Sequence, residues 1–534
     1  MRVSVLGFLT IIISFNDTVK DQLILGYDFG TSAVKVALFS QNGTLIDHAS
    51  DSYPLILPQK GWAEQRPDDW WQSTKRATEA LLAKTKVDVQ SIRAIGLCAQ
   101  MCGTVAVDKR GRPLHNALIW LDTRSEAIAK RITSGLIKVS GYGLGVLARW
   151  LWLTNGAPNL SGKDPISKML WFKEEKPEVW QSTEKLLDVK DYLIHRFCGE
   201  FVTTQDCAHV SWLMDTRPNK RDWSTKLLKA VKLHKNLLPR ITHASDVVGG
   251  LSGEAAKDLG LPAGIAIVGG VGDVAAYALG CGNIDDGAVH MHCGTGGWIA
   301  AHLDHRAVDI FSGVATVCAP DPNRYLLIAA QESAGSCINW AAEKLNIMKS
   351  GAPDFSAFDE LVLSVDEGAN GVLFFPWLYG ERVPVDDSAI RGGFVNLSME
   401  HTRADMARAV LEGVALNSRW ALEPFEKITK TKNEIRLMGG GAVSTVWCQI
   451  FADVLQRSVI QVEKPEFGGC RGAAMSASVG AGIFESLEAA TSMVKVAQTF
   501  KPRSEFSKLY EHKFSNFKKY YKCNKNWYAK INKR

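Results

Sequence analysis

Apolar and polar positions alternate along the chain in two periods, and together they predict an α/β protein. Near the start, apolar runs at residues 23–27 and 33–39 flank a short polar turn, which is typical of a β-hairpin with an unusual tip. Residues 44–48 predict a third strand and residues 92–99 a buried one. Between them, residues 68–85 have helical spacing. This mixture predicts a mixed sheet that is covered by helices.

The pattern of strand, turn and strand returns in the second half of the chain. Residues 287–293 and 298–302 predict two strands around a second Gly-containing turn, Gly294 to Gly297. We therefore predict two domains of related design, with the boundary near residues 282–288. Further predicted elements are helices at residues 331–345, 402–428, 444–455 and 510–521 and a strand at residues 435–438.

Composition is that of an ordinary globular protein, with 46% apolar and 22% charged residues. A length of 534 residues exceeds one ordinary core, which again favours two domains. The net charge of +6 is small, and residues 501–534 contribute eleven Lys or Arg against Glu505 and Glu511. We interpret this end as a solvated helix followed by a basic tail at residues 522–534, and we expect no nucleic-acid partner and no stable membrane association.

Two further features bear on the compartment. The eleven cysteines are scattered and often lie in apolar runs, which favours reduced thiols and a cytoplasmic location. Residues 5–15 are apolar, like a short signal segment, but no small-residue cleavage site follows, and the run is too short to cross a bilayer. We treat residues 1–20 as an extension of unassigned role, with targeting as the alternative.

Three Gly-containing segments carry the candidate chemistry. The carboxylate of Asp28 beside Gly30, Thr31 and Ser32 could hold a hydrated Mg²⁺ while backbone N–H groups face a phosphate, or the turn could use Asp and Gly for backbone reasons alone. Asp273 stands where a strand gives way to a helix. It is either an N-cap or a general base that accepts a proton from an attacking hydroxyl.

The third segment, Gly439-Gly440-Gly441-Ala442, lies between a predicted strand and a predicted helix. Without side chains such a turn admits a flat base or a ribose, although one Gly-rich loop is weak evidence by itself. The chain has no G-x-x-x-x-G-K-[ST] loop and no full G-x-G-x-x-G, so neither a P-loop nor a dinucleotide-binding fold is predicted.

Taken in order, these motifs resemble the FGGY carbohydrate kinases, a branch of the actin, hexokinase and Hsp70 ATPase superfamily, and most closely the xylulokinase subgroup. The resemblance spans about residues 23–521. Its markers are Asp28-Phe29-Gly30-Thr31-Ser32 with Lys35, Gln100-Met101 with Gly103, Trp120-Leu121-Asp122-Thr123-Arg124, Lys168-Met169-Leu170-Trp171-Phe172, Lys190-Asp191-Tyr192-Leu193, Gly272-Asp273, Gly294-Thr295-Gly296, Gly380-Glu381-Arg382-Val383-Pro384, Gly439-Gly440-Gly441-Ala442 and Gly472-Ala473-Ala474.

The resemblance implies an α/β fold of two duplicated ribonuclease H-like domains around an interdomain cleft. Residues 21–283 would form a sugar-binding domain and residues 284–521 a nucleotide-binding domain, and dimers are frequent in the family. It also implies ATP and Mg²⁺ as cofactors and a small sugar as substrate. The implied contacts are Gly30, Thr31, Ser32, Gly294, Thr295, Gly296, Gly440, Gly441 and Ser444 for ATP, Asp28 for Mg²⁺ through water, and Met101, Cys102, Asp273 and Val274 for the sugar, with Asp273 as general base.

Two departures concern the substrate. Typical xylulokinases have His where this chain has Cys102, and Asn where it has Val274. Each change removes a polar partner for a sugar hydroxyl, which alters substrate choice. The expected reaction is phosphorylation of a primary hydroxyl of a ketopentose such as D-xylulose. Alternatives are a kinase for ribulose, gluconate, erythritol or glycerol, a nucleotide-binding regulator on the same fold, and a non-enzymatic membrane-associated protein.

Overall fold

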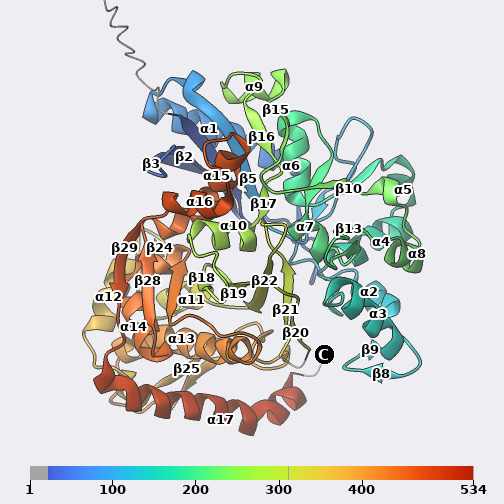
Figure 1. Cartoon of the computed structure of the whole chain (residues 1–534). Coiled ribbons are helices and arrows are strands. Elements are labelled where there is room, and N and C mark those ends of the chain that lie inside the picture. Colours follow the sequence, from blue (N-terminus) through green and yellow to red (C-terminus); the bar gives the residue numbers. More distant parts are fainter. Residues whose placement is uncertain (1–21, 311, 533–534) are drawn as a thin grey trace, which may run out of the picture.

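Two mixed β-sheets, one in each half of the chain, organise the computed structural model (Figure 1). It describes residues 22–310 and 312–532. The expected extension at residues 1–20 lies outside the described residues. We call residues 22–283 the N-terminal half and residues 284–532 the C-terminal half.

The main sheet of the N-terminal half has the order β3-β2-β1-β5-β16-β15, and β17 also pairs with β5. From β3 onward the pairings are antiparallel, antiparallel, parallel, parallel and antiparallel. Apolar side chains fill both faces of β1, which is buried along its whole length. The strands are β1 (Leu23–Phe29), β2 (Ala33–Ser40), β3 (Leu45–Ser52), β5 (Ile92–Ala99), β15 (Val247–Gly250), β16 (Ala266–Val268) and β17 (Val271–Gly272).

The main sheet of the C-terminal half repeats this arrangement. Its strands β22-β19-β18-β27-β28-β29 pair in the same sequence of directions, and β21 and β20 extend it at the β22 edge. The predicted repeat of strand, turn and strand is therefore confirmed as a duplicated sheet topology. The strands are β18 (Val289–Cys293), β19 (Gly297–Leu303), β20 (Val308–Asp309), β21 (Val314–Cys318), β22 (Tyr325–Gln331), β27 (Glu434–Met438), β28 (Ser458–Val462) and β29 (Val496–Phe500).

Two helices cross between the halves. These are α10 (Asp273–Gly280) and α15 (Gly468–Gly480), and α15 packs on β1 and β5 although it comes from the far end of the chain. Glycines allow this close approach. A Cβ atom on Gly26 or on Gly96 would lie about 2 Å from a main-chain oxygen of α15, that of Cys470 or of Ala473. No side chain fits at either position.

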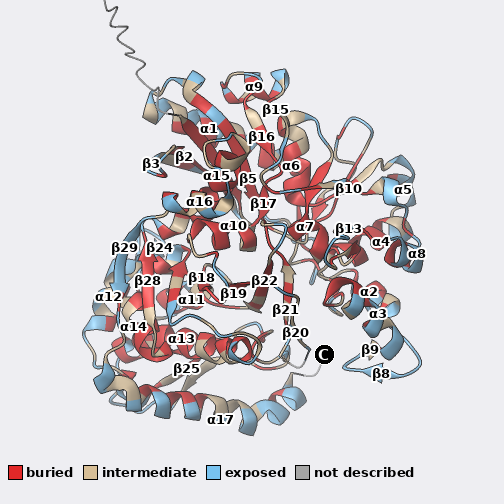
Figure 2. Ribbon diagram, viewed as in Figure 1, coloured by how far each residue is buried: buried red, intermediate tan, exposed pale blue. Residues whose placement is uncertain are grey.

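Helices cover the outer faces of both sheets, and their inward sides are buried (Figure 2). In the N-terminal half they are α1 (Pro67–Thr85), α6 (Val189–Cys198) and α9 (Gly253–Leu259). In the C-terminal half the helices on the sheet are α13 (Arg403–Ile428) and α14 (Thr445–Leu455), and α11 (Gly335–Lys344) and α12 (Phe355–Leu363) pack on α13. Farther out, α17 (Ser507–Ile531) packs on α13 and α14, while α16 (Leu487–Ala490) packs on α15.

The N-terminal half also carries an insertion of short elements between β5 and β15, seen on the right of Figure 1. It has its own apolar core around Trp150, Leu153 and Phe172. Its strands are β6 (Val105–Val107), β7 (Ala117–Leu118), β8 (Lys138–Val139), β9 (Tyr142–Gly143), β10 (Lys185–Leu187), β11 (Val202–Thr204), β12 (Met214–Asp215), β13 (Asp222–Trp223) and β14 (Arg240–Thr242). Its helices besides α6 are α2 (Glu126–Ile132), α3 (Leu144–Thr154), α4 (Pro165–Glu175), α5 (Pro177–Ser182), α7 (Gln205–Val210) and α8 (Thr225–Val231).

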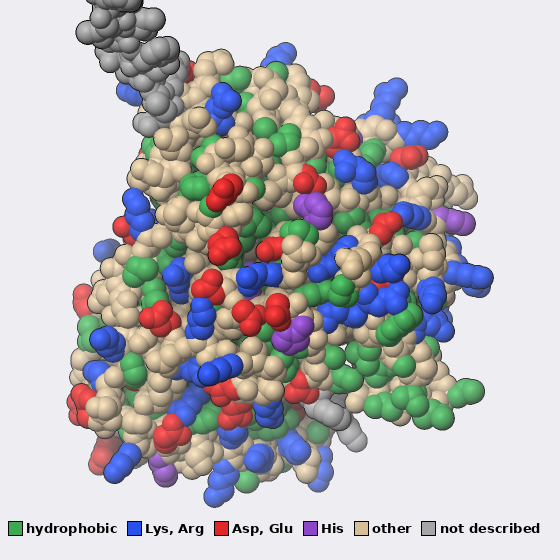
Figure 3. All heavy atoms as spheres, viewed as in Figure 1, with side chains coloured by type: hydrophobic (Ala, Val, Ile, Leu, Met, Phe, Trp, Pro, Cys, Tyr) green, Lys and Arg blue, Asp and Glu red, His purple; other side chains and the backbone are tan. Residues whose placement is uncertain are grey.

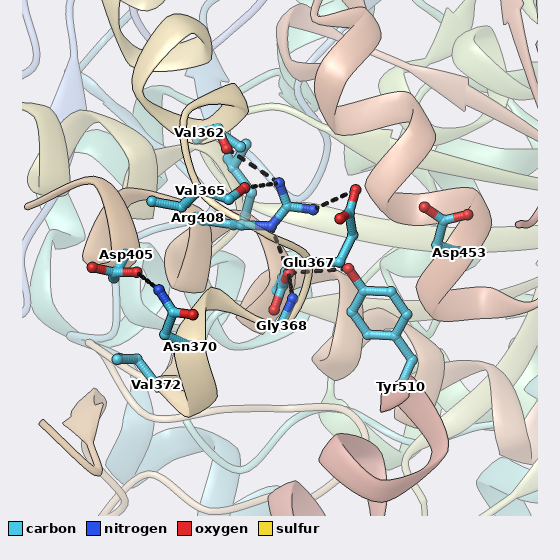
Figure 4. Close-up of polar contacts among 12 residues, drawn as sticks. Val362, Val365, Glu367, Gly368, Asn370, Val372, Asp405, Arg408, Asp453 and Tyr510 are labelled. Atoms are coloured by element: carbon cyan, nitrogen blue, oxygen red, sulfur yellow. Dashed lines mark hydrogen bonds and ion pairs between the residues drawn. The ribbon is translucent and has the colours of Figure 1, made fainter. Parts of the chain in front are cut away.

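The C-terminal helix α17 is fixed to α13 by a buried ionic network, part of which is drawn in Figure 4. Glu412 accepts hydrogen bonds from Arg408 Nε at 3.0 Å, Lys513 Nζ at 2.7 Å and the Tyr510 hydroxyl at 3.0 Å. Arg408 also donates to the main-chain oxygen of Val362, in the last turn of α12, and to that of Val365, just after this helix. A buried carboxylate with two cationic partners holds a unique geometry, so α17 is an integral helix.

Two sequence-based boundaries need correction. The helix predicted at residues 331–345 begins only at Gly335, because Gln331 still pairs with Gly297 as the last residue of β22. The predicted boundary between a helix at residues 510–521 and a basic tail at 522–534 falls inside α17, which continues to Ile531 and buries Tyr528. Within residues 22–310 and 312–532, no helix is long and apolar enough to cross a bilayer.

Candidate active site

Asp28 lies at the carboxyl end of β1, where its side chain is buried between the two halves. Its Oδ1 accepts a hydrogen bond from Cys98 Sγ, and its Oδ2 accepts one from the Tyr277 hydroxyl, each at 3.4 Å. A Cβ atom on Gly469 would lie 2.4 Å from the same carboxylate, so α15 begins directly against it. Burial raises the pKa of Asp28, and the nearby Lys35 ammonium opposes that rise.

The first turn, Gly30 to Ser32, joins β1 to β2 and is held by side chains. Gln65 Nε2 donates to the Thr31 carbonyl oxygen at 2.6 Å, and Trp120 Nε1 donates to Thr31 Oγ1 at 2.9 Å. The Tyr53 hydroxyl donates to the Gly30 carbonyl oxygen at 2.5 Å. Ser32 is exposed. These three side chains hold the turn in place, and Ser32 remains exposed to solvent.

The predicted sugar contacts Met101 and Cys102 form a strained loop directly after β5. Cys102 has a φ of +64°, a conformation that non-glycine residues adopt at a cost. Asp188 holds the loop by accepting the N–H of Cys102 at 3.2 Å and that of Gly103 at 2.7 Å. Lys168 Nζ donates to the Cys102 carbonyl oxygen at 2.7 Å. Burial raises the pKa of the Cys102 thiol, so it is not a nucleophile of the thiolate type.

Asp273 opens α10 beside this loop. Its Oδ1 accepts the N–H of Val274 at 2.8 Å, and the N–H of Gly272 donates to Asp206 Oδ2 at 2.7 Å. A Cβ atom on Gly272 would lie 2.4 Å from Met101 Sδ, so the Met101–Cys102 loop and Asp273 are adjacent. Burial, with smaller contributions from neighbouring carboxylates including that of Asp28, raises the pKa of Asp273 to about 7. The N-cap interpretation is wrong, because Gly272 is the N-cap of α10 and Asp273 is its first helical residue. A pKa near neutrality is what a general base requires, and that role of Asp273 stays a prediction.

The second turn, Gly294 to Gly296, joins β18 to β19 and is held by main-chain groups at the start of α11. The N–H of Gly335 donates to the Gly294 carbonyl oxygen at 2.7 Å, and the N–H of Ser336 donates to that of Thr295 at 3.1 Å. Thr295 is exposed. The turn therefore presents an open hydroxyl and its own backbone to the space in front of it.

The third segment follows β27 and lies against the second turn. Gly440 has open space where a side chain would project, whereas a Cβ atom on Gly441 would meet the ring of Trp447 and the side chain of Cys293. Ser444 Oγ accepts the N–H of Trp447 at 3.1 Å and donates to Asp359 at 2.9 Å. Ser444 is therefore engaged as the N-cap of α14.

Comparisons with known proteins give the family of this chain. Residues 23–280 match the N-terminal domain of the FGGY family of carbohydrate kinases, and residues 289–481 match its C-terminal domain. This chain belongs to the FGGY family of carbohydrate kinases. It is an enzyme that phosphorylates a sugar.

Individual relatives agree with the family assignment. The carbohydrate kinase is 30% identical to a xylulose kinase of Staphylococcus epidermidis, with 94% of this chain and 97% of the relative covered. It is 32% identical to a xylulose kinase of Bacillus subtilis, with 93% and 96% covered. A crystal structure of a gluconate kinase from Lactobacillus acidophilus matches with a TM-score of 0.83 at 26% identity, covering 96% of this chain and all of the other.

An aromatic cluster in this carbohydrate kinase escaped the sequence analysis. Tyr277 on α10 packs edge-on against His292 with ring centroids 4.3 Å apart, and His292 stacks on Trp298 at 3.7 Å. The cluster therefore joins the Asp28 carboxylate, through the Tyr277 hydroxyl, to the two strands that flank the second turn. His292 and Trp298 are cross-strand partners in the hairpin of β18 and β19, so this pair is local in sequence. The contact of both rings with Tyr277 depends on how α10 packs, and no local pattern predicts it.

Three marker residues of the carbohydrate kinase have structural contacts. Asp122 and Arg124 form a buried ion pair, with Arg124 Nη2 2.8 Å from Asp122 Oδ2 and 2.7 Å from Glu64 Oε1. Lys35 donates from Nζ to the Glu466 carbonyl oxygen at 3.0 Å. It therefore links β2 to the segment before α15 and is not simply solvated.

Ion pairs also connect the two halves of the kinase. Lys163 Nζ in the insertion lies 3.2 Å from Glu332 Oε1, and Arg382 Nε lies 2.8 Å from the same oxygen. Glu381 is buried, and it accepts the main-chain N–H groups of Glu332 and Arg382 at 2.9 Å each. Burial raises the pKa of Glu381 to about 7. Glu381 and Arg382 thus hold Glu332 in place, and Glu332 pairs with Lys163 of the insertion.

Proposed function

We propose that this kinase transfers the γ-phosphoryl group of ATP to the primary hydroxyl of a ketopentose, D-xylulose, to give D-xylulose 5-phosphate. Support for the sugar comes from the two xylulose kinases at 30 and 32% identity over nearly the whole chain. The observation that carries the chemistry is Asp273, a carboxylate with a pKa of about 7 beside the Met101–Cys102 loop.

In this proposal the predicted domain of residues 21–283 binds the sugar, and the predicted domain of residues 284–521 binds the nucleotide. Met101, Cys102 and Val274 would line the sugar with Asp273. The open space at Gly440 and the contact of Gly441 with Cys293 would place the adenosine beside the second turn. Further nucleotide contacts in the proposal are Gly30, Thr31, Ser32, Gly294, Thr295, Gly296 and Ser444.

The donor set at Asp28 fits a hydrated Mg²⁺. Among the described residues no three His, Cys, Asp or Glu side chains are grouped closely enough to ligate a metal directly. A lone carboxylate is suited to contact through water, since Mg²⁺ retains several waters in phosphate sites. Asp28 would hold the ion, and the ion would neutralise charge on the transferring phosphate.

Proton transfer is assigned to Asp273. Its carboxylate takes the proton of the attacking hydroxyl, that oxygen forms a bond to the γ-phosphorus, and the bond to the ADP oxygen breaks. The first and second turns position the phosphates with backbone N–H groups, while the ion pair of Lys163 with Glu332 holds the halves together around the site. Positioning and exclusion of water supply most of the acceleration in such transfers.

In this proposal, Cys102 and Val274 determine which sugar the kinase selects. A thiol and an isopropyl group offer the sugar weaker partners than His and Asn, so the hydroxyls facing them are less strongly selected. Gluconate is the second candidate, because the gluconate kinase structure matches the whole chain. Ribulose, erythritol and glycerol complete the test set.

A cytoplasmic homodimer is the assembly that the family resemblance implies, and gel filtration checks the dimer.

The deciding experiment measures ADP release from Mg-ATP with D-xylulose, D-ribulose, L-ribulose, gluconate, erythritol and glycerol. We expect strong stimulation by D-xylulose. In Asp273→Ala, kcat should fall by about 10²–10⁴-fold, the range of a general base. Near-normal turnover of this variant would remove Asp273 from the role. Sugar-independent ATP hydrolysis, unchanged in the variant, would instead favour a nucleotide-binding regulator.

A further inference from the structure

A hollow of about 570 Å³ opens in the insertion, away from the Asp273 site. It lies among β10, β13, β14 and the segment before β14. Its apolar lining includes Trp223, Phe201 and Pro239. Its polar lining has four cationic side chains, Lys185, Arg221, Lys235 and Arg240, and one carboxylate, Asp222. Cavities of a few hundred cubic ångströms with an apolar lining suit small molecules.

The cationic charge of this hollow is not neutralised within the protein. Lys185 donates to the main-chain oxygens of Asn236 and Leu238, which are neutral acceptors. Arg221 Nη1 donates to the neutral side chain of Gln205 at 3.1 Å, and its guanidinium lies 4.5 Å from the centroid of the Tyr325 ring, so it keeps its charge but is held on one side of the hollow. Across the described ranges, the guanidinium of the exposed Arg240 makes no hydrogen bond and no ion pair.

The single carboxylate offers little compensation. Lys235 Nζ lies 2.7 Å from Asp222 Oδ2, with the two side chains 55% and 58% exposed. An exposed pair of this kind contributes little to stability, because water screens both charges, and it opens readily. Lys235 is thus free to turn toward an anion at little cost. The hollow therefore carries an excess of positive charge over an apolar floor.

The surrounding chain strengthens this field. Residues 217–240 contain eight Lys or Arg and only one acidic residue, although the whole protein has a net charge of only +6. Figure 3 shows Lys and Arg side chains gathered over the side of the molecule that carries α8 and β13. A concentration of one sign of charge raises the local concentration of oppositely charged ligands.

We propose that this hollow is a second ligand site and that it binds a small organic phosphate. Lys235 and Arg240 would bind the phosphate, since a guanidinium group makes paired hydrogen bonds to phosphate oxygens. The carbon part of the ligand would lie on the ring of Trp223. A polyanion such as RNA would use the exposed lysines outside the hollow equally, whereas a small molecule would use the side chains that line it, and these include the apolar ones.

The hollow is separated from the sugar loop by one wall of side chains. Trp223, Leu238 and Pro239 line the hollow on one side and a small inner cavity on the other. That inner cavity also touches Gly103 and Asp188. Asp188 accepts the N–H groups of Cys102 and Gly103, so a ligand that shifts the wall would move the sugar loop. This regulatory consequence rests on the proposed function, whereas binding in the hollow does not.

Isothermal titration calorimetry tests the binding, with D-ribose 5-phosphate, D-ribose and inorganic phosphate as probes and no ATP present. We expect D-ribose 5-phosphate to bind and D-ribose not to bind. The double variant Lys235→Glu with Arg240→Glu should weaken binding by at least about tenfold, the effect of losing charged hydrogen bonds. The matched control is Lys226→Glu with Lys229→Glu, two exposed residues of α8 outside the hollow, with an expected change below about twofold.

Three results would overturn the proposal. These are no binding to the wild type, equal loss in both double variants, and undiminished binding in the hollow variant, which would place the phosphate at the active site. A short single-stranded RNA that binds more tightly, with equal loss in both variants, would identify a general basic surface instead.

The kinetic arm measures the KM for D-xylulose with and without D-ribose 5-phosphate. We expect the KM to change at least about threefold in the wild type and in the control, and not in the hollow variant. An unchanged KM in all three proteins would reject the regulatory consequence while leaving the calorimetric result standing. Calorimetry on Asp273→Ala separates the proposals, because the hollow should still bind there whether or not Asp273 is the base.

Discussion

The two turns that face the active site have the same place in the duplicated sheets but are fastened differently. The first, around Thr31, is held by the side chains of Tyr53, Gln65 and Trp120. The second, around Thr295, is held by main-chain N–H groups at the start of α11. One topology therefore supports a turn built on side-chain contacts and a turn built on backbone contacts.

The difference also concerns how the first turn is connected to the Met101–Cys102 loop. Gln65 Oε1 also accepts a hydrogen bond from Gln100 Nε2 at 2.8 Å, and Gln100 directly precedes the Met101–Cys102 loop. A chain of side-chain hydrogen bonds thus runs from the start of the Met101–Cys102 loop, through Gln100 and Gln65, to the first turn. Such a network couples the positions of its members, whereas the second turn follows the rigid helix behind it.

The backbone character of the second turn gives the largest expected effect. A Cβ atom on Gly335 would lie 2.6 Å from the Gly294 carbonyl oxygen. We expect Gly335→Ala to displace the turn and to lower kcat/KM for ATP about 10²-fold, since displacements near 1 Å can have this cost. Steady-state kinetics with varied ATP checks it.

The matched control for that change is Gly145→Ala, at a helical glycine with open space around it. It should leave the kinetics unchanged, since alanine is favoured over glycine in a helix. Wild-type kinetics in Gly335→Ala would contradict the idea of a backbone-built second turn.

The next largest effect is the pH dependence of kcat/KM, which distinguishes a titrating group in the N-terminal half from one in the C-terminal half. Burial raises the pKa of Asp273 to about 7 in one half and that of Glu381 to about 7 in the other. Because a general base must be ionised, kcat/KM should fall about tenfold per pH unit below about 7. This acidic limb of the pH profile should stay at the same pH in Glu381→Gln, even if the rate is lower. A limb that moves with Glu381 would assign the titration to the C-terminal half.

Stability should show the opposite trend with pH. A carboxyl whose pKa is raised on folding binds its proton more tightly in the folded state than in the unfolded state. Its contribution to the free energy of unfolding is therefore fully present below about pH 4 and is lost as the pH rises through about 7. We expect Asp273→Asn to have a higher melting temperature than the wild type at pH 8, measured by differential scanning calorimetry. A lower melting temperature at pH 8 would contradict the cost of burying this charge.

A moderate effect is expected for the side-chain support of the first turn. Trp120→Phe removes the donor to Thr31 Oγ1, and a neutral hydrogen bond of this kind contributes about 0.5–1.5 kcal/mol. We expect kcat to fall about 3- to 10-fold. A double-mutant cycle with Thr31→Val should show that the two losses do not add. Additive losses would mean that this hydrogen bond does not position the turn.

The smallest effect is expected for Tyr277→Phe. The distance of 3.4 Å between the Tyr277 hydroxyl and Asp28 exceeds that of a strong hydrogen bond, while the ring keeps its contacts in the variant. The apparent KM for Mg²⁺ should change by less than about threefold. A much larger change would show that this hydroxyl, and not only the carboxylate, serves the metal.

Local pattern was enough to predict both hairpins, the position of Asp273 at a helix start and the duplication. Packing between distant segments was beyond it. The cover that α15 gives to β1 and β5, and the carbonyl that Lys35 reaches, depend on residues more than about 360 positions away. The end of α17 was missed because its last turns are polar, while the ionic network that anchors the helix involves α13.

The placement of α15 has a consequence for how the protein is made. The sheet of β1 and β5 is among the first parts to leave the ribosome, but the helix that fits against Gly26 and Gly96 is encoded at residues 468–480. During translation the first sheet must wait with one apolar face uncovered until nearly the whole chain has emerged. The N-terminal half therefore cannot complete its folding before the C-terminal half is synthesised, and the nascent chain is exposed to aggregation throughout that interval.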